Sequence, residues 1–360
     1  MSDNLMVDKD LMFFVEHFPF GKEINQKSFL VTGATGLLGS IFIKCLLKMK
    51  ELKKVELSIV GIARNAEKVK AIFGDAPVIW IYQDMCDSLS SIEVPVDYII
   101  HCASPTSSQF YVEYPVETIN TAFLGTNSLL SYACTHKVES FVYLSSLESY
   151  GVVVDEIEIK EENSGYINPL DVRSGYSLGK KMVECLCHSY AKEYGVPVKI
   201  ARLTQTFGAG VSLEDTRVFA QFAKSIIKGE DLIMHTSGES SKPYCYTIDA
   251  IMAIFYLLLK GENGEAYNVA NPNTYTSIRG MAEMLSQAFN SQSKVIVKLK
   301  SNMGYAPITK LRLNVDKLKQ LGWEPYFSLE EMFDRLIEYY KKNEKNKIVC
   351  FHDVCRFGKS

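Results

Sequence analysis

A glycine-rich turn between an apolar strand and an apolar helix constrains the fold of this chain more than any other feature. Residues 31–39 read V-T-G-A-T-G-L-L-G, so the glycines follow a G-x-x-G-x-x-G spacing. The turn follows the apolar run at 29–31 and opens into the apolar stretch at 41–49. Glycines in such a turn let the backbone approach a pyrophosphate, whose charge is favoured at the N-terminus of the helix. The segment therefore predicts a strand–turn–helix unit that binds a dinucleotide.

Short apolar segments alternate with helical segments over the first two hundred residues. We predict strands at 28–32, 56–62, 78–82, 97–101, 140–145 and 198–203, and helices near 37–50, 65–72, 115–136 and 174–194. This alternation favours a parallel sheet with helices on both faces. The predicted fold class is α/β, a Rossmann-type doubly wound parallel sheet. With 47% hydrophobic residues, the chain can bury a sizeable core.

Tyr176 and Lys180 stand four positions apart in the segment S-G-Y-S-L-G-K at 174–180. In a helix this spacing places both side chains on one face. A lysine ammonium beside a phenol favours the phenolate, so we expect a lowered pKa for Tyr176 and a usable base near neutral pH. A buried-type strand at 141–146 ends in two serines, Ser145 and Ser146, upstream of this pair.

Together these segments resemble the extended short-chain dehydrogenase/reductase family, in its branch of NAD-dependent nucleotide-sugar epimerases and dehydratases. Four more segments fit in the family's order: 98–105 as the motif over the cofactor, 145–151 as the serine strand with its Y-G ending, 201–208 as the R-L-x-N-x-Y-G segment and 244–249 as the Y-V-x-D segment. The resemblance spans about residues 26–340 and lies near the UDP-glucuronate decarboxylase and 4,6-dehydratase groups. It implies a smaller C-terminal lobe that binds the substrate, a nucleotide-diphosphate sugar.

The domain organisation that follows from this resemblance has four parts. We predict an N-terminal extension at 1–27, a dinucleotide-binding domain at 28–204, a lobe mainly for the substrate at 205–343 and a tail at 344–360. Some segments of the lobe are expected to return to the dinucleotide-binding domain.

The resemblance implies hydride transfer between a sugar carbon and a nicotinamide. Tyr176 is then the base that takes the proton of the sugar hydroxyl, and Ser146 hydrogen-bonds the same hydroxyl. Lys180 lowers the pKa of Tyr176 and holds the nicotinamide ribose. Counting back from the Y-G ending at 150–151 selects Ser146 rather than Ser145 as the catalytic serine.

Glu148 leaves the type of reaction open. Dehydratases and decarboxylases of this family carry an acidic residue at this place, whereas a simple 4-epimerase needs none. Leu147 replaces the acid or hydroxyl residue beside it, and leucine cannot protonate a leaving hydroxyl, which weakens a 4,6-dehydratase. The segment H-C-A-S-P-T at 101–106 resembles decarboxylases, but G-A-G at 208–210 departs from their G-P-R. An epimerase and a Glu-assisted enzyme are therefore equally favoured.

The implied cofactor site comprises the glycine-rich turn and residues at the ends of several strands. These residues are Gly33, Thr35, Gly36, Leu37, Leu38, Gly39, Arg64, Asp84, Met85, Cys102, Ala103, Ser104 and Lys180. NAD-preferring folds usually place an acid after the second strand, but V-G-I-A-R-N at 60–65 contains none. Arg64 can meet a 2′-phosphate, so NAD and NADP both stay open.

The implied substrate-binding residues lie in the motifs that follow the cofactor site. They are Thr106, Ser146, Gln205, Arg217 and Lys242. Lys242 stands where the family usually has a phosphate-binding arginine, so it keeps the charge and loses the bidentate fork. Arg217 is a second candidate for the diphosphate.

Composition argues against several other classes of protein. A net charge of −3 gives no broad cationic field for nucleic acid. No apolar run is long enough to span a membrane, and the short run at 11–15 is predicted to be an N-terminal helix packed on the body. Nine cysteines without a C-x-x-C pair indicate buried, reduced thiols in a cytoplasmic protein, so we expect no metal site.

The expected function is an enzyme that oxidises C4 of a nucleotide sugar with tightly bound NAD or NADP, then epimerises the product or eliminates from it. We expect it to act in surface-polysaccharide sugar biosynthesis. Two alternatives are a net NADP-dependent reductase or dehydrogenase and a non-catalytic nucleotide-binding protein on the same fold. The family also implies a homodimer through helices near 115–136 and 176–194, with an apolar stripe formed by Met182, Val183, Leu186 and Tyr190.

Overall fold

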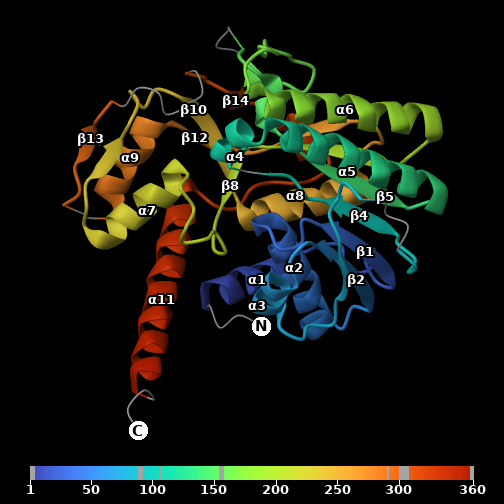
Figure 1. Ribbon diagram of the computed structural model, residues 1–360, viewed down its shortest axis with the longest axis horizontal. Coiled ribbons are helices and arrows are strands. Elements are labelled where there is room, and N and C mark those ends of the chain that lie inside the picture. Colours follow the sequence, from blue (N-terminus) through green and yellow to red (C-terminus); the bar gives the residue numbers. More distant parts are fainter. Residues whose placement is uncertain are drawn as a thin grey trace.

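Seven parallel strands form the central sheet of the computed structural model, which describes residues 5–87, 92–105, 107–153, 158–289, 292–299 and 308–356 (Figure 1). Their spatial order is β3-β2-β1-β4-β5-β7-β11. The strands are β1 Lys27–Thr32, β2 Leu57–Ala63, β3 Ile79–Tyr82, β4 Tyr98–His101, β5 Ser140–Ser146, β7 Val198–Leu203 and β11 Ala266–Val269. The order reverses between β1 and β4, and ligands of such sheets bind at this reversal, outside the carboxyl ends of the strands.

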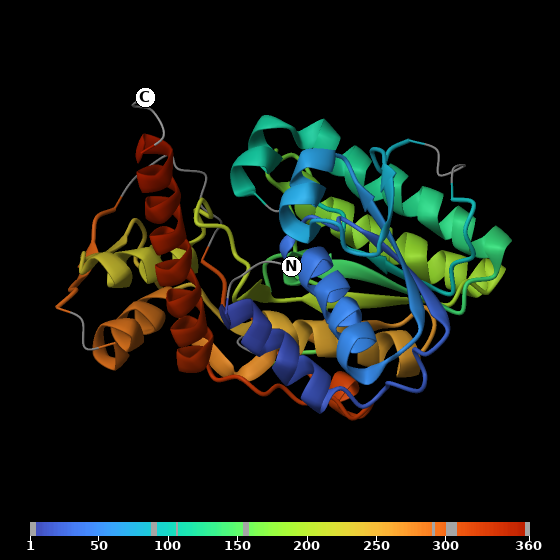
Figure 2. The ribbon, with the colours of Figure 1, turned by 90° about the horizontal axis from the view of Figure 1, so that it is seen from below.

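Helices cover both faces of this sheet (Figures 1 and 2). α5 Pro115–His136 and α6 Ser174–Tyr194 pack on one face, and α2 Leu37–Lys53 and α8 Thr247–Lys260 on the other, with α1 Leu5–His17 outside α2. Because both faces are covered, the strands are apolar throughout, and residues 29–31 are fully buried. The predicted doubly wound α/β class is confirmed. The strands and helices predicted for residues 28–203 are all present, with ends shifted by no more than three residues.

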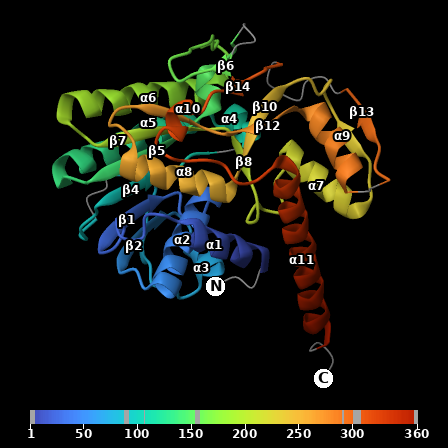
Figure 3. The ribbon, with the colours of Figure 1, turned by 180° about the vertical axis from the view of Figure 1, so that it is seen from behind.

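The remaining elements form a smaller lobe beside the sheet (Figure 3). Its strands are β8 Gln205–Phe207, β10 Ser241–Tyr246 and β12 Asn271–Ser277 in one sheet, and two parallel pairs, β9 Leu232–Met234 with β13 Val295–Val297 and β6 Glu158–Ile159 with β14 Arg312–Leu313. Its helices are α7 Val218–Lys228, α9 Ile278–Ala288 and α11 Leu329–Arg356. The short helices α3 Ala66–Phe73, α4 Ser108–Glu113, η1 Leu147–Tyr150 and α10 Asp316–Lys319 complete the described chain.

The predicted N-terminal helix is α1, and it packs on the body as expected. Leu11, Phe14 and Val15 are buried in the main hydrophobic core. Asp10 is only 3% exposed and accepts hydrogen bonds from the Tyr246 hydroxyl and the Arg335 guanidinium, both at 2.5 Å. Burial raises the pKa of Asp10 to about 6, although both partners lower it. One buried carboxylate thus joins α1, β10 and α11.

The thiols differ in part from the expectation. Cys45, Cys187 and Cys245 are free and buried, as expected, but free thiols at Cys86, Cys134 and Cys185 are exposed, so that expectation was wrong for these three. Cys134 and Cys185 lie on helices α5 and α6, whose period turns some positions outward. In the part of the chain that the structure describes, no helix combines the length and apolarity needed to cross a bilayer.

Candidate functional site

A cavity of about 660 Å³ opens at the carboxyl ends of the strands, and residues of the smaller lobe line it as well. It contains every site residue predicted above except Thr106, which lies outside the described residues. The glycine-rich turn, the loop after β4, the end of β5, the first turns of α6 and three residues of the lobe therefore meet around one space. The binding and catalytic roles of these residues remain predictions.

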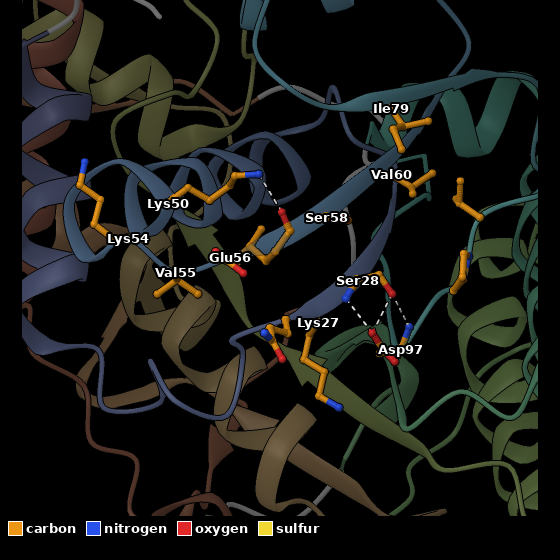
Figure 4. A pocket seen from close by; sticks show the side chains of 14 residues that line it. Lys27, Ser28, Lys50, Lys54, Val55, Glu56, Ser58, Val60, Ile79 and Asp97 are labelled. Atoms are coloured by element: carbon orange, nitrogen blue, oxygen red, sulfur yellow. Dashed lines mark hydrogen bonds between the residues drawn. The ribbon is translucent and has the colours of Figure 1, made fainter.

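A second hollow, of about 830 Å³, lies at the opposite, amino-terminal edge of the sheet (Figure 4). Several of its polar groups already have partners. Lys50 donates to the Leu57 carbonyl oxygen at 2.7 Å, the Ser28 hydroxyl donates to Asp97 at 2.7 Å, and Lys27 pairs with Glu139 at 2.5 Å. These pairings engage Lys27, Lys50 and Asp97, and the predicted site residues line the other cavity, so we take the cavity at the carboxyl ends as the candidate site.

Two glycines of the turn are required by close backbone approaches. Gly33 has a φ of +60°, and a Cβ there would lie 2.7 Å from the Ala103 nitrogen. A Cβ on Gly39 would lie 2.4 Å from the Gly33 oxygen. Gly36 caps α2 without a side-chain hydrogen bond, and the first turn of α2 holds no acidic residue. The exposed amides of this helix start suit a negative ligand, so the cradle fits the pyrophosphate of a dinucleotide.

A chain of hydrogen bonds holds the loop after β4 against this turn. Thr126 donates to the Ala122 oxygen at 2.7 Å, so its oxygen accepts from His101 Nε2 at 3.0 Å. His101 Nδ1 then accepts from the Thr32 hydroxyl at 2.6 Å, and Thr32 accepts from the Ala103 amide at 3.3 Å. Burial lowers the pKa of His101 to about 3, which keeps the ring neutral. Sequence reasoning considered His101 only as part of the segment at 101–106, and it missed the role of His101 in positioning the loop after β4.

The end of β5 separates the two serines. The Ser145 hydroxyl donates to Glu184 at 2.5 Å, and Glu184 pairs with Arg202 at 2.7 Å in the interior. Ser146 lines the cavity, and its oxygen accepts from the Glu148 amide at 3.2 Å. Both serines line the cavity, but Glu184 engages the hydroxyl of Ser145, so the Ser146 hydroxyl is the one more available to a ligand, and its catalytic role stays a prediction.

The pKa of Tyr176 departs from the expectation. Burial first and the Glu148 carboxylate second raise it to about 12, although Ser146, Tyr111 and Arg217 lower it. Lys180 Nζ lies 5.9 Å from the centre of the Tyr176 ring and donates instead to the Leu144 oxygen at 2.7 Å. The expected lowering of the Tyr176 pKa by Lys180 was therefore wrong for this structure, because desolvation outweighs it. Burial also lowers the pKa of Lys180 to about 8.

Glu148 lies beside Tyr176 and has two polar neighbours. The Ser177 hydroxyl donates to its Oε2 at 3.3 Å, and a terminal nitrogen of Arg173 lies 3.7 Å from the same atom. Sequence reasoning missed Arg173. Its signal was an arginine three positions before Tyr176, a spacing that places both side chains on one helix face.

The two predicted diphosphate cations have different surroundings. Arg217 forms a two-pronged pair with Asp215, with a shortest contact of 2.6 Å. Lys242 lines the same cavity, and the described residues give it no ion pair of its own. Burial lowers the pKa of Lys242, and the Glu148 carboxylate opposes that shift. Lys242 is therefore the cation that is more available to an anionic ligand.

At the other end of the cavity, Arg64 and Asp84 form an exposed ion pair at 3.4 Å. Asp84 also accepts from the Cys86 amide at 2.9 Å, and that bond lowers the pKa of Asp84. Lys68, on the first turns of α3, lines the same end and was missed by sequence reasoning. Two cations thus lie where the resemblance places the adenosine ribose.

Comparison with known proteins gives one family and one fold. Residues 29–270 match the sequence model of the NAD dependent epimerase/dehydratase family. UDP-glucuronic acid decarboxylase 1 of Xenopus tropicalis is 30% identical over 340 residues, which are 91% of this chain and 76% of that protein. UDP-glucuronic acid decarboxylase 3 of Arabidopsis thaliana is 29% identical over 306 residues, covering 84% of this chain and 85% of that one.

Two solved structures have a similar fold. UDP-glucose 4-epimerase from Thermotoga maritima, solved with UDP-glucose, has a TM-score of 0.75 and 22% identity, and the match covers 88% of this chain and 99% of that one. UDP-glucuronic acid 4-epimerase from Bacillus cereus, solved with UDP-glucuronic acid and NAD, has a TM-score of 0.74 and 22% identity, with the same coverage of 88% and 99%. At this identity the likeness concerns the fold alone.

Proposed function

We propose that this chain, which belongs to the NAD dependent epimerase/dehydratase family, oxidises C4 of a nucleotide uronate and then releases the C6 carboxyl as carbon dioxide. The observation that carries the proposal is the position of Glu148 in the cavity, beside Tyr176 and Arg173. A carboxylate at this place has no task in a simple 4-epimerase. The relatives from Xenopus tropicalis and Arabidopsis thaliana, which are UDP-glucuronic acid decarboxylases, support the same choice.

Leu147 argues against the third outcome, 4,6-dehydration. Leu147 lines the cavity next to Glu148, and its apolar side chain carries no proton for a leaving hydroxyl. Arg173 and Lys242 add two cations near Glu148, an arrangement that suits a substrate with a carboxylate of its own. Both features favour a uronate over a neutral hexose.

The proposed chemistry follows from the positions of these side chains. Tyr176 removes the proton of the C4 hydroxyl in its phenolate form, which Ser146, Tyr111 and Arg217 favour against the effect of burial, and Ser146 holds the same oxygen. The glycine-rich turn and Lys180 would hold NAD, which would supply the hydride acceptor for the oxidation of C4 and the hydride donor for its later reduction. The C4 carbonyl lies beta to the C6 carboxyl, so it takes up the electron pair when the C5–C6 bond breaks and carbon dioxide leaves. A proton then enters C5, and Tyr176 gives its proton back to the C4 oxygen.

A second candidate is 4-epimerisation of the same class of substrate. Ala209 and Gly210 stand where decarboxylases commonly carry Pro and Arg. An epimerase would use Tyr176, Ser146 and Lys180 in the same way and would leave the C5–C6 bond intact. The two candidates therefore differ in whether Glu148 is needed.

The test is conversion of UDP-glucuronate in the presence of NAD, followed by mass spectrometry, with other UDP-, dTDP-, GDP- and CDP-sugars as a panel. Loss of carbon dioxide supports the proposal. An unchanged mass with an inverted C4 in the NMR spectrum supports the epimerase instead, and loss of water contradicts both. Glu148→Gln is the matched variant: in a decarboxylase it should still oxidise C4 but release carbon dioxide more slowly.

We also propose that the chain forms a homodimer through α5 and α6. Val116, Ile119 and Leu124 of α5 and Met182 of α6 are exposed apolar residues on these two helices. The predicted apolar stripe of α6 does not form one exposed surface. Val183 is buried in the core, and the Tyr190 hydroxyl donates to Asn127 of α5. A monomer mass by light scattering at micromolar concentration would contradict the dimer.

The cytoplasmic location and a role in surface-polysaccharide synthesis likewise stay predictions.

A further inference from the structure

Two phenol rings lie face to face in the cavity. The ring of Tyr111 stacks on the ring of Tyr176 with centres 4.3 Å apart and planes within 7° of parallel. Tyr111 is 4% exposed, and both residues line the cavity. Of the aromatic stacks in the described residues, this one involves the proposed base directly, so it bears on the chemistry of Tyr176.

Tyr111 comes from α4, which follows the loop at the cofactor end of β4. The Tyr111 hydroxyl lies 3.3 Å from the Pro105 oxygen, to which it donates. Ser107 caps α4 by accepting from the Phe110 amide at 3.4 Å. The ring of Tyr111 is therefore fixed from both sides, by its own helix and by the loop that includes Ala103 and Ser104.

We propose that Tyr111 is a positioning residue for the base Tyr176: its ring holds the phenol of Tyr176 in place, and its hydroxyl, which donates to the Pro105 oxygen in this structure, turns its one proton toward Tyr176 when the phenolate forms. The inference rests on the proposed function in one respect, the role of Tyr176 as base for C4 oxidation. A donor beside a developing phenolate stabilises the charged form of Tyr176 and leaves the neutral form less affected.

The electrostatics of the pair agree with this geometry. After burial, which raises the pKa of both phenols, contact with Tyr111 lowers the pKa of Tyr176, and the same contact raises the pKa of Tyr111. Tyr111 is thus the member that keeps its proton. The other groups that interact with Tyr176 are Tyr143, Ser146, Glu148, Lys180 and Arg217. Arg173 acts on Tyr111, and Lys242 lines the same cavity. Glu148 opposes Tyr111, because its negative charge raises the pKa of Tyr176.

The experiment measures the first turnover, the appearance of reduced nicotinamide on mixing enzyme, NAD and UDP-glucuronate, as a function of pH. Tyr111→Phe keeps the ring and removes the hydroxyl. In a plot of the first-turnover rate against pH, we expect the rising limb of Tyr111→Phe to shift to higher pH by about one unit. The plateau rate should stay within a few fold of that of the parent. Glu148→Gln should move the same limb down, since it removes a negative charge beside Tyr176 while permitting C4 oxidation.

Two further variants separate the ring from the hydroxyl. Tyr111→Leu removes the ring and the hydroxyl together. It should lower the plateau rate and also shift the rising limb to higher pH. Tyr132→Phe is the control, because Tyr132 also stacks on a ring, that of His136, but lies outside the cavity. Thermal unfolding of each variant checks that it folds.

The outcomes distinguish this inference from the proposed function. An unmoved limb in Tyr111→Phe, with Glu148→Gln moving as expected, overturns the role of Tyr111 and leaves the proposed function standing. A parent enzyme that oxidises none of the nucleotide sugars overturns the proposed function. The inference falls with it, because Tyr176 would then have no C4 hydroxyl proton to remove. A limb moved upward in Tyr111→Phe and downward in Glu148→Gln supports both.

Discussion

The ammonium of Lys180 donates a hydrogen bond to the carbonyl oxygen of Leu144 at 2.7 Å. One turn further along α6, Glu184 accepts from the hydroxyl of Ser145 at 2.5 Å. Two successive turns of the helix thereby hold two successive residues of β5. These two hydrogen bonds fix the position of the next residue, Ser146, at the cavity. The geometry of the site thus depends on contacts that do not touch a ligand.

The two serines should respond differently to loss of the hydroxyl. Ser146→Ala should lower the rate of C4 oxidation by ~10²-fold, because it removes a hydrogen bond to the reacting oxygen, and should leave the free energy of unfolding nearly unchanged. Ser145→Ala should lower the free energy of unfolding by ~1–3 kcal/mol, because buried Glu184 loses a donor. Single-turnover kinetics and urea unfolding of both variants give the comparison. Equal kinetic losses in the two would contradict the assignment of Ser146.

Tyr176→Phe should reduce turnover by ~10²–10⁴-fold, since it removes a positioned acid/base. NAD affinity and thermal stability should stay close to those of the parent. Tyr190→Phe, on the same helix but bonded to Asn127 outside the cavity, is the matched control and should retain turnover. Turnover of Tyr176→Phe near the parental rate would rule out Tyr176 as the base.

Valine at two glycines of the turn should separate binding from folding. A Cβ at Gly36 would meet only the Gly33 oxygen, at 3.2 Å, so Gly36→Val should fold and lose NAD binding through a clash with the pyrophosphate. Gly39→Val should lower stability, since its Cβ would lie 2.4 Å from the Gly33 oxygen. Titration calorimetry with NAD and thermal unfolding measure the two effects. Unchanged NAD affinity in Gly36→Val would refute the predicted cofactor site.

The neutral His101 should make folding depend on pH. Its folded pKa of about 3 lies below the unfolded value of about 6.5, so the unfolded chain binds the extra proton between these values. The stability from this group is complete above about pH 6.5 and is lost as the pH falls, by at most ~1.4 kcal/mol per pH unit. The gap in free energy of unfolding between the parent and His101→Asn should therefore shrink from neutral pH to about pH 5.

Two buried carboxylates make the free energy of unfolding depend on pH in the opposite direction. Their effects cancel when the parent is compared with His101→Asn. Burial raises the pKa of Asp10 to about 6 and that of Asp249 to about 7, so their contributions are present at low pH and are lost as the pH rises through these values. Both proteins contain them. A gap between the parent and His101→Asn that does not change with pH would mean that His101 is not held neutral.

Arg64 should matter more for a phosphorylated cofactor than for NAD. Its guanidinium is largely exposed and pairs with Asp84 across the end of the cavity, so a 2′-phosphate can compete for it. Arg64→Ala should weaken NADP binding about fivefold to tenfold and change NAD binding little. Fluorescence titration with the reduced forms of both cofactors measures the ratio. An equal loss for both would remove Arg64 from the choice of cofactor.

The sequence predicted the family, the fold class and the general chemistry, and these predictions are confirmed: the chain is an NAD-dependent enzyme of the nucleotide-sugar epimerase and dehydratase family. The features that carry these predictions are local. The glycine-rich turn, the Tyr176–Lys180 spacing and the alternation of strands and helices each lie within a short stretch of chain, where period and spacing carry the structure.

Features that depend on contacts between distant segments could not be predicted. Tyr111 meets Tyr176 only because α4 and the start of α6 come together at the cavity, and no spacing relates the two positions. The pKa of Tyr176 is governed first by burial, which a sequence does not reveal, so the expected effect of Lys180 was overestimated. Arg173 was readable in principle from its helical spacing to Tyr176, but its contact with Glu148 was not.

The carboxylate of Asp10 also restricts the order in which the chain can fold during its synthesis. Arg335, one of its two hydrogen-bond partners, lies 325 residues further along the chain, and Tyr246 lies 236 residues further. The ribosome therefore releases α1 long before the groups that satisfy its buried acid exist. Since a buried carboxylate without partners is costly, we expect α1 to dock last although it is made first. A ribosome stalled before Arg335 should display an N-terminal helix that proteases still cut.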